Sequence, residues 1–486
     1  MTFDSLVALV GLAAAIYALL PRHRRLDMWL RITGVEITVL VVAVILIHYL
    51  QFYAVFASCG LVLSLPLARF GLTPESTSYL VIAATALFVW LRMRFYKLSS
   101  GHLARLRTLS EELLWQREYA ELAGLTKTHL RNLATRFRSE PEAQDVTRLL
   151  LSHPDFVRET ALTDPYFGLG VLDHDLYEKH EFLSIYIREL LATPSSALYF
   201  EVRNNQNLAR GHRYELPASN RILHYLFADA SVAKDLAVYR PIGESVLGEL
   251  RALHFKTNGD PYLLPVDSFS DDNHADNQWR SLVFVGLRLF DIMVMEALHQ
   301  QIAWHMWLYY LPTVTGHILA NYSEDGPGVD SSNEWPTRYS YLLYEIISMQ
   351  RNWIRSVRDL PNGNCHKTLA DTAATHDNQH IPKSAILSLT QCVQKIAECE
   401  RVGQQFKNYL LEMVFGLFRD LFQEQPALAA CLLNAIRCPG GWCRPSRVYA
   451  KSVRSAWNAC DQIPYHSQAK KQLEQALSDL AEQGTE

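Results

Sequence analysis

The chain has 486 residues, of which 49 % are hydrophobic and 20 % charged, and its formal net charge at pH 7 is −4. This length suits a membrane region with about two further domains. Residues 1–97 hold eight Arg or Lys against four Asp or Glu, a net charge of +4, which leaves −8 for residues 98–486. An acidic remainder excludes attraction of nucleic acid by bulk charge, so any such site must be a local basic patch.

Three apolar segments dominate the first 97 residues. The longest begins at residue 32, and its stretch Ile37–Ile47 (ITVLVVAVILI) has no polar face. A helix needs about 20 apolar residues to cross the hydrocarbon core of a bilayer. The pattern therefore predicts three crossings, at about residues 3–20, 32–56 and 79–93. A fully buried core helix in a soluble protein is the alternative explanation for the longest segment.

Two basic clusters orient these segments. One, Arg22–Arg25, follows the first apolar segment, and the other, Arg92–Lys97, closes the third. Under the positive-inside rule both clusters lie in the cytoplasm, which three crossings satisfy and four do not. The predicted protein is a multi-pass protein of the inner (plasma) membrane, with its N-terminus outside and its large C-terminal domain in the cytoplasm.

Glu36, His48 and Gln51 are the exceptional polar residues of the longest apolar segment. Polar groups at membrane depth usually face protein or water, so these residues are candidates for a polar or ion path. Three crossings cannot enclose a pore alone, and a conducting path therefore requires a homo-oligomer. Hydrogen bonding between helices without conduction is the alternative explanation.

Helical periodicity recurs through the rest of the chain, and Ala197–Val202 (ALYFEV) is the one segment that predicts a strand. The predicted fold class is mainly α: three N-terminal transmembrane helices followed by a large α-rich cytosolic domain with little β. The expected divisions are a transmembrane region over 1–97, a helical stalk or connector over 98–160, a core domain over 161–336 and a C-terminal helical domain over 337–486.

The segment Trp279–Leu311 predicts the longest helix of the cytosolic part and the centre of its core. A fourth membrane crossing over 281–311 is the alternative. Charged residues in mid-segment, such as Arg288 and Asp291, make insertion into lipid costly and favour the core helix.

Catalytic signatures are missing from the sequence. It has no phosphate-binding Gly-x-x-x-x-Gly-Lys loop, no Gly-x-Gly-x-x-Gly, no His-Glu-x-x-His and no Gly-x-Ser-x-Gly. We therefore expect no catalytic residue, no cofactor and no metal. Cys438 and Cys443 come closest to a metal knuckle, but their spacing is at the edge of the zinc-ligand range and a Pro-Gly turn is favoured.

Two groups of arginines predict a ligand site. One group repeats at i, i+4 and i+7 on one helical face close to Trp353 and several tyrosines, and the other lies in the polar segment 203–213. Arginine forks suit phosphates and aromatic faces suit stacked bases. A solvated helix face with ordinary core aromatics is the alternative. The six candidate residues are Arg203, Arg210, Arg213, Arg351, Arg355 and Arg358.

This layout, a compact membrane anchor before a large α-rich domain without catalytic motifs, resembles in its overall architecture the membrane effectors of bacterial anti-phage defence, of the CBASS or Hailong type. The resemblance implies an oligomeric effector or channel whose cytosolic domain senses a nucleotide or single-stranded oligonucleotide and gates permeabilisation of the membrane. A membrane-tethered scaffold that recruits a protein partner encoded nearby, or a membrane enzyme with an unrecognised motif, are the alternatives.

Overall fold

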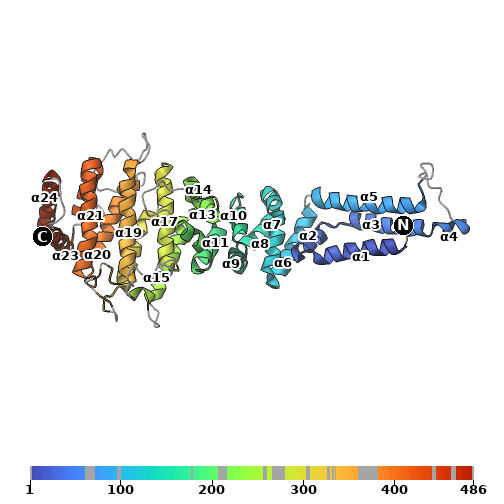
Figure 1. The fold of residues 1–486 in the computed structure, drawn as a ribbon, viewed down its shortest axis with the longest axis horizontal. Helices are drawn as coiled ribbons and strands as arrows, with labels where there is room; N and C mark the ends of the chain where they lie inside the picture. The colour runs from blue at the N-terminus through green and yellow to red at the C-terminus, as the bar shows by residue number, and fades with distance from the viewer. Residues whose placement is uncertain are drawn as a thin grey trace. The chain divides into compact units, whose positions relative to one another are not determined.

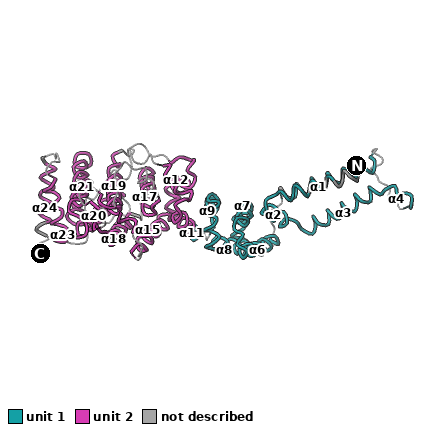
Figure 2. Tube along the Cα trace, turned by 60° about the horizontal axis from the view of Figure 1, so that its bottom comes forward, with its two compact units in different colours: residues 1–182 teal, residues 183–486 magenta. Residues whose placement is uncertain are grey.

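We describe the protein from a computed structural model, in which helices follow one another along the whole chain (Figure 1). The description covers residues 3–60, 72–95, 100–176, 179–205, 216–254, 260–264, 280–302, 307–325, 329–330, 333, 335–359, 381–439, 445–460 and 467–483. The contacts divide the chain into two compact units, unit 1 over Met1–Phe182 and unit 2 over Leu183–Glu486 (Figure 2).

The described residues are mainly helical and contain no strand, which confirms the predicted fold class at this level. The strand predicted at Ala197–Val202 is wrong, because these residues form helix α12, Ala197–Asn204. Leu198 and Val202, one turn apart, are fully buried, so the helix satisfies the same apolar residues that suggested a strand.

Unit 1 begins with four helices rich in apolar residues and one that is basic. Their bounds are α1 Phe3–Leu19, α2 Arg22–Arg31, α3 Gly34–Gln51, α4 Tyr53–Ser58 and α5 Pro74–Phe95. Helices α3 and α5 pack against each other. Most side chains of α3 are exposed, including Val41, Val44 and Ile45, which is the arrangement expected of a helix surrounded by lipid.

Two of these helices are long and apolar enough to cross a membrane, α3 over Gly34–Gln51 and α5 over Pro74–Arg92. The prediction of three such helices is therefore met only in part. Helix α1 has 17 residues, which at about 1.5 Å per residue gives about 25 Å, less than the roughly 30 Å of the hydrocarbon core.

The remainder of unit 1 is a set of short helices: α6 Ser100–Trp115, α7 Tyr119–Arg136, α8 Pro141–Leu151, α9 Pro154–Thr163 and α10 Pro165–Leu172. Three of them begin with proline, whose fixed φ and missing N–H suit the first helical position. Helix α11, Lys179–Ala192, contains the point at which the two units divide.

Unit 2 is an array of helices in which the strongest contacts join elements close in sequence. In one row α15 packs on α17, α17 on α19, α19 on α21 and α21 on α23; in a second row α18 packs on α20, α20 on α22 and α22 on α24. Figure 1 shows the order α17, α19 and α21 along the chain's colours. The predicted boundary at 336/337 falls just before α19, which packs on both α17 and α20.

The bounds of the unit 2 elements follow. They are α12 Ala197–Asn204, α13 Arg221–Phe227, α14 Ala230–Asp235, α15 Tyr239–His254, η3 Pro261–Leu263, α17 Leu282–His299, η4 Trp307–Tyr309, α18 Leu311–Asn321, α19 Arg338–Ser356, η5 Val357–Asp359, α20 Ile381–Glu398, α21 Gln404–Glu424, α22 Pro426–Arg437, α23 Arg447–Ala459 and α24 Ser467–Gln483.

The single helix predicted over Trp279–Leu311 is wrong in length. Helix α17 ends at His299, and Gln301 has a φ of 63°, which a continuing helix cannot adopt. The side chain of Gln300 fixes this end, because it donates to Ala228 O at 2.8 Å and accepts from Ala230 N at 2.9 Å. Helix α17 is buried within unit 2, as expected of a core helix.

Candidate functional site

The arginines predicted on one helical face do gather on one surface of unit 2. Arg351 and Arg355 lie on α19 and Arg358 on η5, and Arg419 of the neighbouring helix α21 joins them. We call these four residues the arginine face. The side chains of Arg355, Arg419 and Arg358 are 33 %, 32 % and 54 % exposed, so solvent reaches them.

Two carboxylates of α21 lie against the arginine face. Asp420 pairs with Arg355 and also accepts from Arg419 Nη2 at 2.9 Å. Glu424 pairs with Arg358, with an Nη1 to Oε1 distance of 3.2 Å. The Nε atom of Arg351 is buried and has no hydrogen-bond partner among the described residues. Within the described part of α19, η5 and α21, four guanidinium groups lie with two carboxylates on this surface, an excess of positive charge.

Burial and the neighbouring arginines of this face lower the pKa of Arg351 and of Arg355. Burial, followed by repulsion from Arg351, Arg358 and Arg419, lowers the pKa of Arg355 to about 10. Burial likewise lowers the pKa of Arg351, and Arg419 adds to the effect. An anion bound here would relieve this repulsion.

An aromatic cluster made by Trp335, Tyr341, Tyr344 and Tyr409 adjoins the arginine face. The rings of Trp335 and Tyr344 lie 5.0 Å apart, and those of Tyr344 and Tyr409 stack at 6.1 Å. Arg351 follows Tyr344 by seven residues, two turns along the same side of α19. The surface therefore offers ring faces beside positive charge, the combination that suits stacked bases and their phosphates.

Sequence reasoning placed Trp353 close to this surface, and the structure places its side chain in the core, with 0 % exposure. It missed Arg419 and Tyr409, because both are on α21, more than 50 residues after Arg355, and only the packing of α19 on α21 brings them near. The Arg419-Asp420 dipeptide carried no pattern that distinguishes it from an ordinary solvated pair.

The second predicted arginine group is only partly visible. Arg203 lies on α12 with an exposed side chain, and α12 packs on α13 and α17. Arg210 and Arg213 lie outside the described residues. Their part in a ligand site stays a prediction.

The polar residues of α3 have separate environments. Glu36 is 5 % exposed, accepts from Thr33 N at 2.8 Å, and pairs with Arg92 of α5 at 2.6 Å. His48 has an exposed side chain whose Nδ1 lies 2.9 Å from Val44 O, and Gln51 is half-buried. Twelve residues separate Glu36 from His48, about 18 Å along the helix, so they form no single cluster within one chain.

No group of three or more His, Cys, Asp or Glu side chains that could hold a metal occurs among the described residues. Cys438 has a half-buried thiol just after α22, and Cys443 lies outside the described residues.

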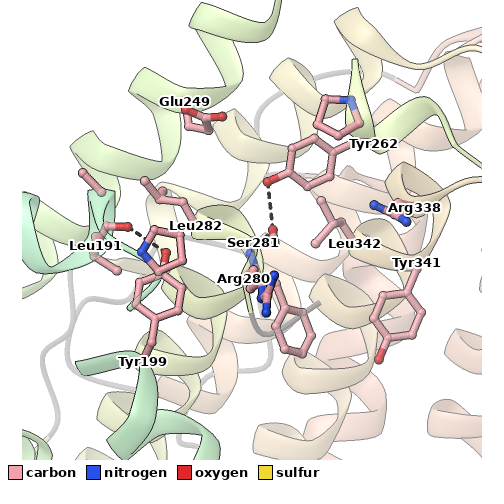
Figure 3. A pocket seen from close by; sticks show the side chains of 14 residues that line it. Leu191, Tyr199, Glu249, Tyr262, Arg280, Ser281, Leu282, Arg338, Tyr341 and Leu342 are labelled. Carbon is pink, nitrogen blue, oxygen red and sulfur yellow. Dashed lines mark hydrogen bonds between the residues drawn. The ribbon is translucent and has the colours of Figure 1, made fainter. Parts of the chain in front are cut away.

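A second feature of unit 2 was not anticipated: a cavity of about 350 Å³ lined by residues of α11, α12, α15, η3, α17 and α19 (Figure 3). We call it the unit 2 cavity. Its walls are apolar, with Leu282, Phe284 and Leu342 among them, and its charged groups are Glu249, Arg280 and Arg338. Six separate elements contribute, which explains why no local pattern in the sequence revealed it.

Three tyrosines line the cavity, and each has its hydroxyl group already engaged. Tyr199 donates to Leu191 O at 2.7 Å, and Tyr262 lies 2.8 Å from Ser281 Oγ (Figure 3). Tyr341 donates to Glu345 Oε1 at 2.5 Å. Burial raises the pKa of Tyr262 to about 12 and raises that of Tyr199 as well. These tyrosines are therefore neutral and offer the cavity their rings.

No protein-family model, curated protein or solved structure matches this chain. The class of protein that the structure defines is accordingly broad: a mainly α chain of two units with two helices of membrane-crossing length in the first.

Proposed function

We propose that this protein is a membrane-anchored sensor in which unit 2 binds a phosphate-bearing ligand, a nucleotide or short single-stranded oligonucleotide, at the arginine face. Binding is proposed to gate permeabilisation of the membrane by an oligomer of the N-terminal helices, as in the defence effectors that the layout resembles. The observation that carries the proposal is the surface of α19 and α21, where four arginines meet two carboxylates beside the aromatic cluster.

Charge explains why a ligand belongs there. Like charges within a few Å destabilise one another, and Arg351 lacks a partner for its buried Nε among the described residues. Phosphate oxygens accept two parallel hydrogen bonds from a guanidinium group, which makes phosphate a better partner than a chloride ion. The adjacent rings of Tyr344 and Tyr409 would add stacking with a base.

The proposed membrane arrangement retains three crossings. Helices α3 and α5 are two of them, and α1 is the proposed third, because the basic cluster Arg22–Arg25 that follows it belongs in the cytoplasm. This leaves the N-terminus outside and unit 2 in the cytoplasm. Since three helices per chain cannot enclose a pore, permeabilisation requires a homo-oligomer.

Fluorescence anisotropy with the full-length protein in nanodiscs tests ligand binding. The probes are labelled six-nucleotide single-stranded DNA and RNA and a labelled cyclic dinucleotide. Arg351→Gln and Arg419→Gln should each weaken binding and lower the salt dependence of log K by about 0.7 for single strands, the contribution of one phosphate contact. Asp420→Asn should strengthen binding, because it releases Arg355 and Arg419 from their shared carboxylate.

Arg454→Gln is the matched control, since Arg454 is an exposed arginine on α23. It should leave binding unchanged. Flat anisotropy with all probes at low salt, or equal weakening by Arg454→Gln, would reject the arginine face as a phosphate site. Dye release from proteoliposomes on addition of the bound probe then tests permeabilisation, and Arg351→Gln should abolish it.

A membrane-tethered scaffold is the second candidate function, and the helical array of unit 2 favours it. Stacked helices that each contact their near neighbours present extended surfaces that suit protein partners. The Asp420→Asn variant distinguishes the sensor from the scaffold. A sensor should bind phosphate probes more tightly after this change, whereas a scaffold for protein partners should not.

A further inference from the structure

The unit 2 cavity lies within one compact unit, and its chemistry differs from that of the arginine face. Residues of α11, α12, α15, α17 and α19 line it (Figure 3), whereas the arginine face lies on α19, η5 and α21. Its volume of about 350 Å³ falls at the lower end of the range for small-molecule sites, roughly 300–1,000 Å³.

The lining defines what the cavity can accept. The hydroxyl groups of Tyr199, Tyr262 and Tyr341 all have partners within the protein, so the tyrosines act as apolar walls with Leu282, Phe284 and Leu342. A ligand with many polar groups would leave those groups without hydrogen bonds, at a cost for each. A purine nucleotide, with polar atoms on its base, ribose and phosphate, fits this lining poorly.

The charged side chains that line the cavity are mainly cationic. Among the residues that the structure describes, Arg280 and Arg338 line the cavity with one carboxylate, Glu249. The Nε of Arg338 is buried and has no hydrogen-bond partner among the described residues. Figure 3 shows Arg280 in the middle of the lining and Arg338 beside Leu342. One negative charge on a ligand would balance this excess and supply an acceptor for Arg338.

We propose that the unit 2 cavity binds a small organic acid, an apolar body that carries one carboxylate, with the acid group at Arg280 and Arg338 and the body between the ring of Tyr199, Phe284 and Leu342. The experiment determines whether the apolar body is aromatic or aliphatic. This site does not rest on the function proposed for the arginine face.

The probes are 2-naphthoate, its neutral amide 2-naphthamide, octanoate and AMP, each titrated by calorimetry into the full-length protein in nanodiscs, with empty nanodiscs subtracted. We expect saturable binding of an acid, tighter for 2-naphthoate than for 2-naphthamide by about tenfold, the ratio that a free-energy difference of about 1.4 kcal/mol produces. Tighter binding of octanoate than of 2-naphthoate would identify the body as aliphatic, of the kind released from lipids.

Three variants locate the binding. Arg338→Met keeps an unbranched aliphatic side chain without the charged guanidinium group and should remove the preference for the acid over the amide. Leu342→Trp fills the cavity and should abolish binding of both. Arg351→Gln, in the arginine face, and Arg454→Met, at an exposed site, should leave both affinities unchanged.

The proposal fails if 2-naphthoate and 2-naphthamide bind the native protein equally, or if neither acid binds at millimolar concentration. It also fails if AMP is the tightest of the four and Leu342→Trp abolishes its binding. The circular dichroism spectrum of Leu342→Trp shows whether that variant folds. If Leu342→Trp does not fold, Arg338→Met alone tests the proposed site.

Discussion

The indole Nε1 of Trp353 donates a 2.7 Å hydrogen bond to the carboxylate of Asp291, and both side chains lie in the core of unit 2. Arg288 joins them, 3.7 Å from Asp291 and 2.7 Å from Glu345, which in turn accepts from Tyr341. Burial raises the pKa of Asp291 despite these partners. These contacts form a polar network that joins α17 to α19.

Trp353→Phe should lower the free energy of unfolding by about 1–3 kcal/mol, because it leaves a buried carboxyl group without its indole donor. Replacing both partners, as Trp353→Phe with Asp291→Leu, should cost less than the sum of the two single changes. Thermal unfolding followed by circular dichroism measures the effect. Strict additivity would show that the hydrogen bond contributes nothing to stability.

At Gly286 of α17, the side chain of Val246 on α15 lies close to the backbone. A Cβ atom at this position would overlap the side chain of Val246. Gly286→Ala should therefore destabilise unit 2 by about 1–3 kcal/mol through overpacking, against a gain of at most about 1 kcal/mol in helix propensity. The thermal midpoint should fall, and Val246→Ala should restore part of the loss.

Gly248→Ala is the control for that pair. Gly248 lies on α15, where an added Cβ meets no atom within 4 Å. The change should stabilise the helix by about 0.5–1 kcal/mol. If Gly286→Ala raises the thermal midpoint as Gly248→Ala does, the close approach of α15 and α17 does not limit the stability of unit 2.

The lowered pKa of Asp27 in unit 1 should make the stability of this unit depend on pH. Burial pushes its pKa upward, but hydrogen bonds from His129 and Arg31, with distances of 2.6 Å and 2.8 Å, outweigh burial and lower the pKa below its ordinary value. A carboxyl group with a lowered folded-state pKa stabilises the fold above its unfolded pKa. This stabilisation should disappear as the pH falls from the unfolded value of 3.8 through the lowered one.

Asp27→Asn should consequently destabilise unit 1 near pH 7, by about 1.5–3 kcal/mol for the loss of hydrogen bonds to a charged group. The difference from the native protein should shrink as the pH approaches the acid window. Thermal unfolding in nanodiscs at several pH values measures it. A difference that stays constant down to pH 2 would contradict the assigned pKa shift.

The number of crossings is open to a direct test at the N-terminus. Three crossings put the N-terminus outside, whereas α3 and α5 alone would put it inside, and both arrangements keep residue 486 in the cytoplasm. In a variant without native cysteines, Thr2→Cys should react with a membrane-impermeant maleimide added to intact cells. If Thr2→Cys is labelled only after the cells are opened, the N-terminus is inside and α1 does not cross the membrane.

Sequence patterns predicted helices well where apolar or charged residues recur at helical spacing over a local segment, as over α17 and α19. They failed where distant contacts decide. The helix at Ala197–Asn204 is held by Glu201, whose carboxylate accepts from the backbone N–H groups of Ile222 and Leu223, at 2.8 Å and 2.9 Å.

The same limit applies to the candidate site. The helical spacing of Arg351, Arg355 and Arg358 was visible in the sequence, whereas their carboxylate partners on α21 were not. Glu345 is close to these arginines in the sequence, but the structure pairs it with Arg288 in the core. The end of α17 likewise depends on Gln300 reaching Ala228 and Ala230, about 70 residues earlier.

The order of contacts in unit 2 has a consequence for its synthesis. Nearly every strong helix pair there joins elements that follow one another closely along the chain, from α15 with α17 to α22 with α24. A chain leaving the ribosome can therefore bury each helix soon after it emerges, without waiting for the far end. Growth of the core in step with translation would keep apolar helices such as α17 and α20 exposed only briefly.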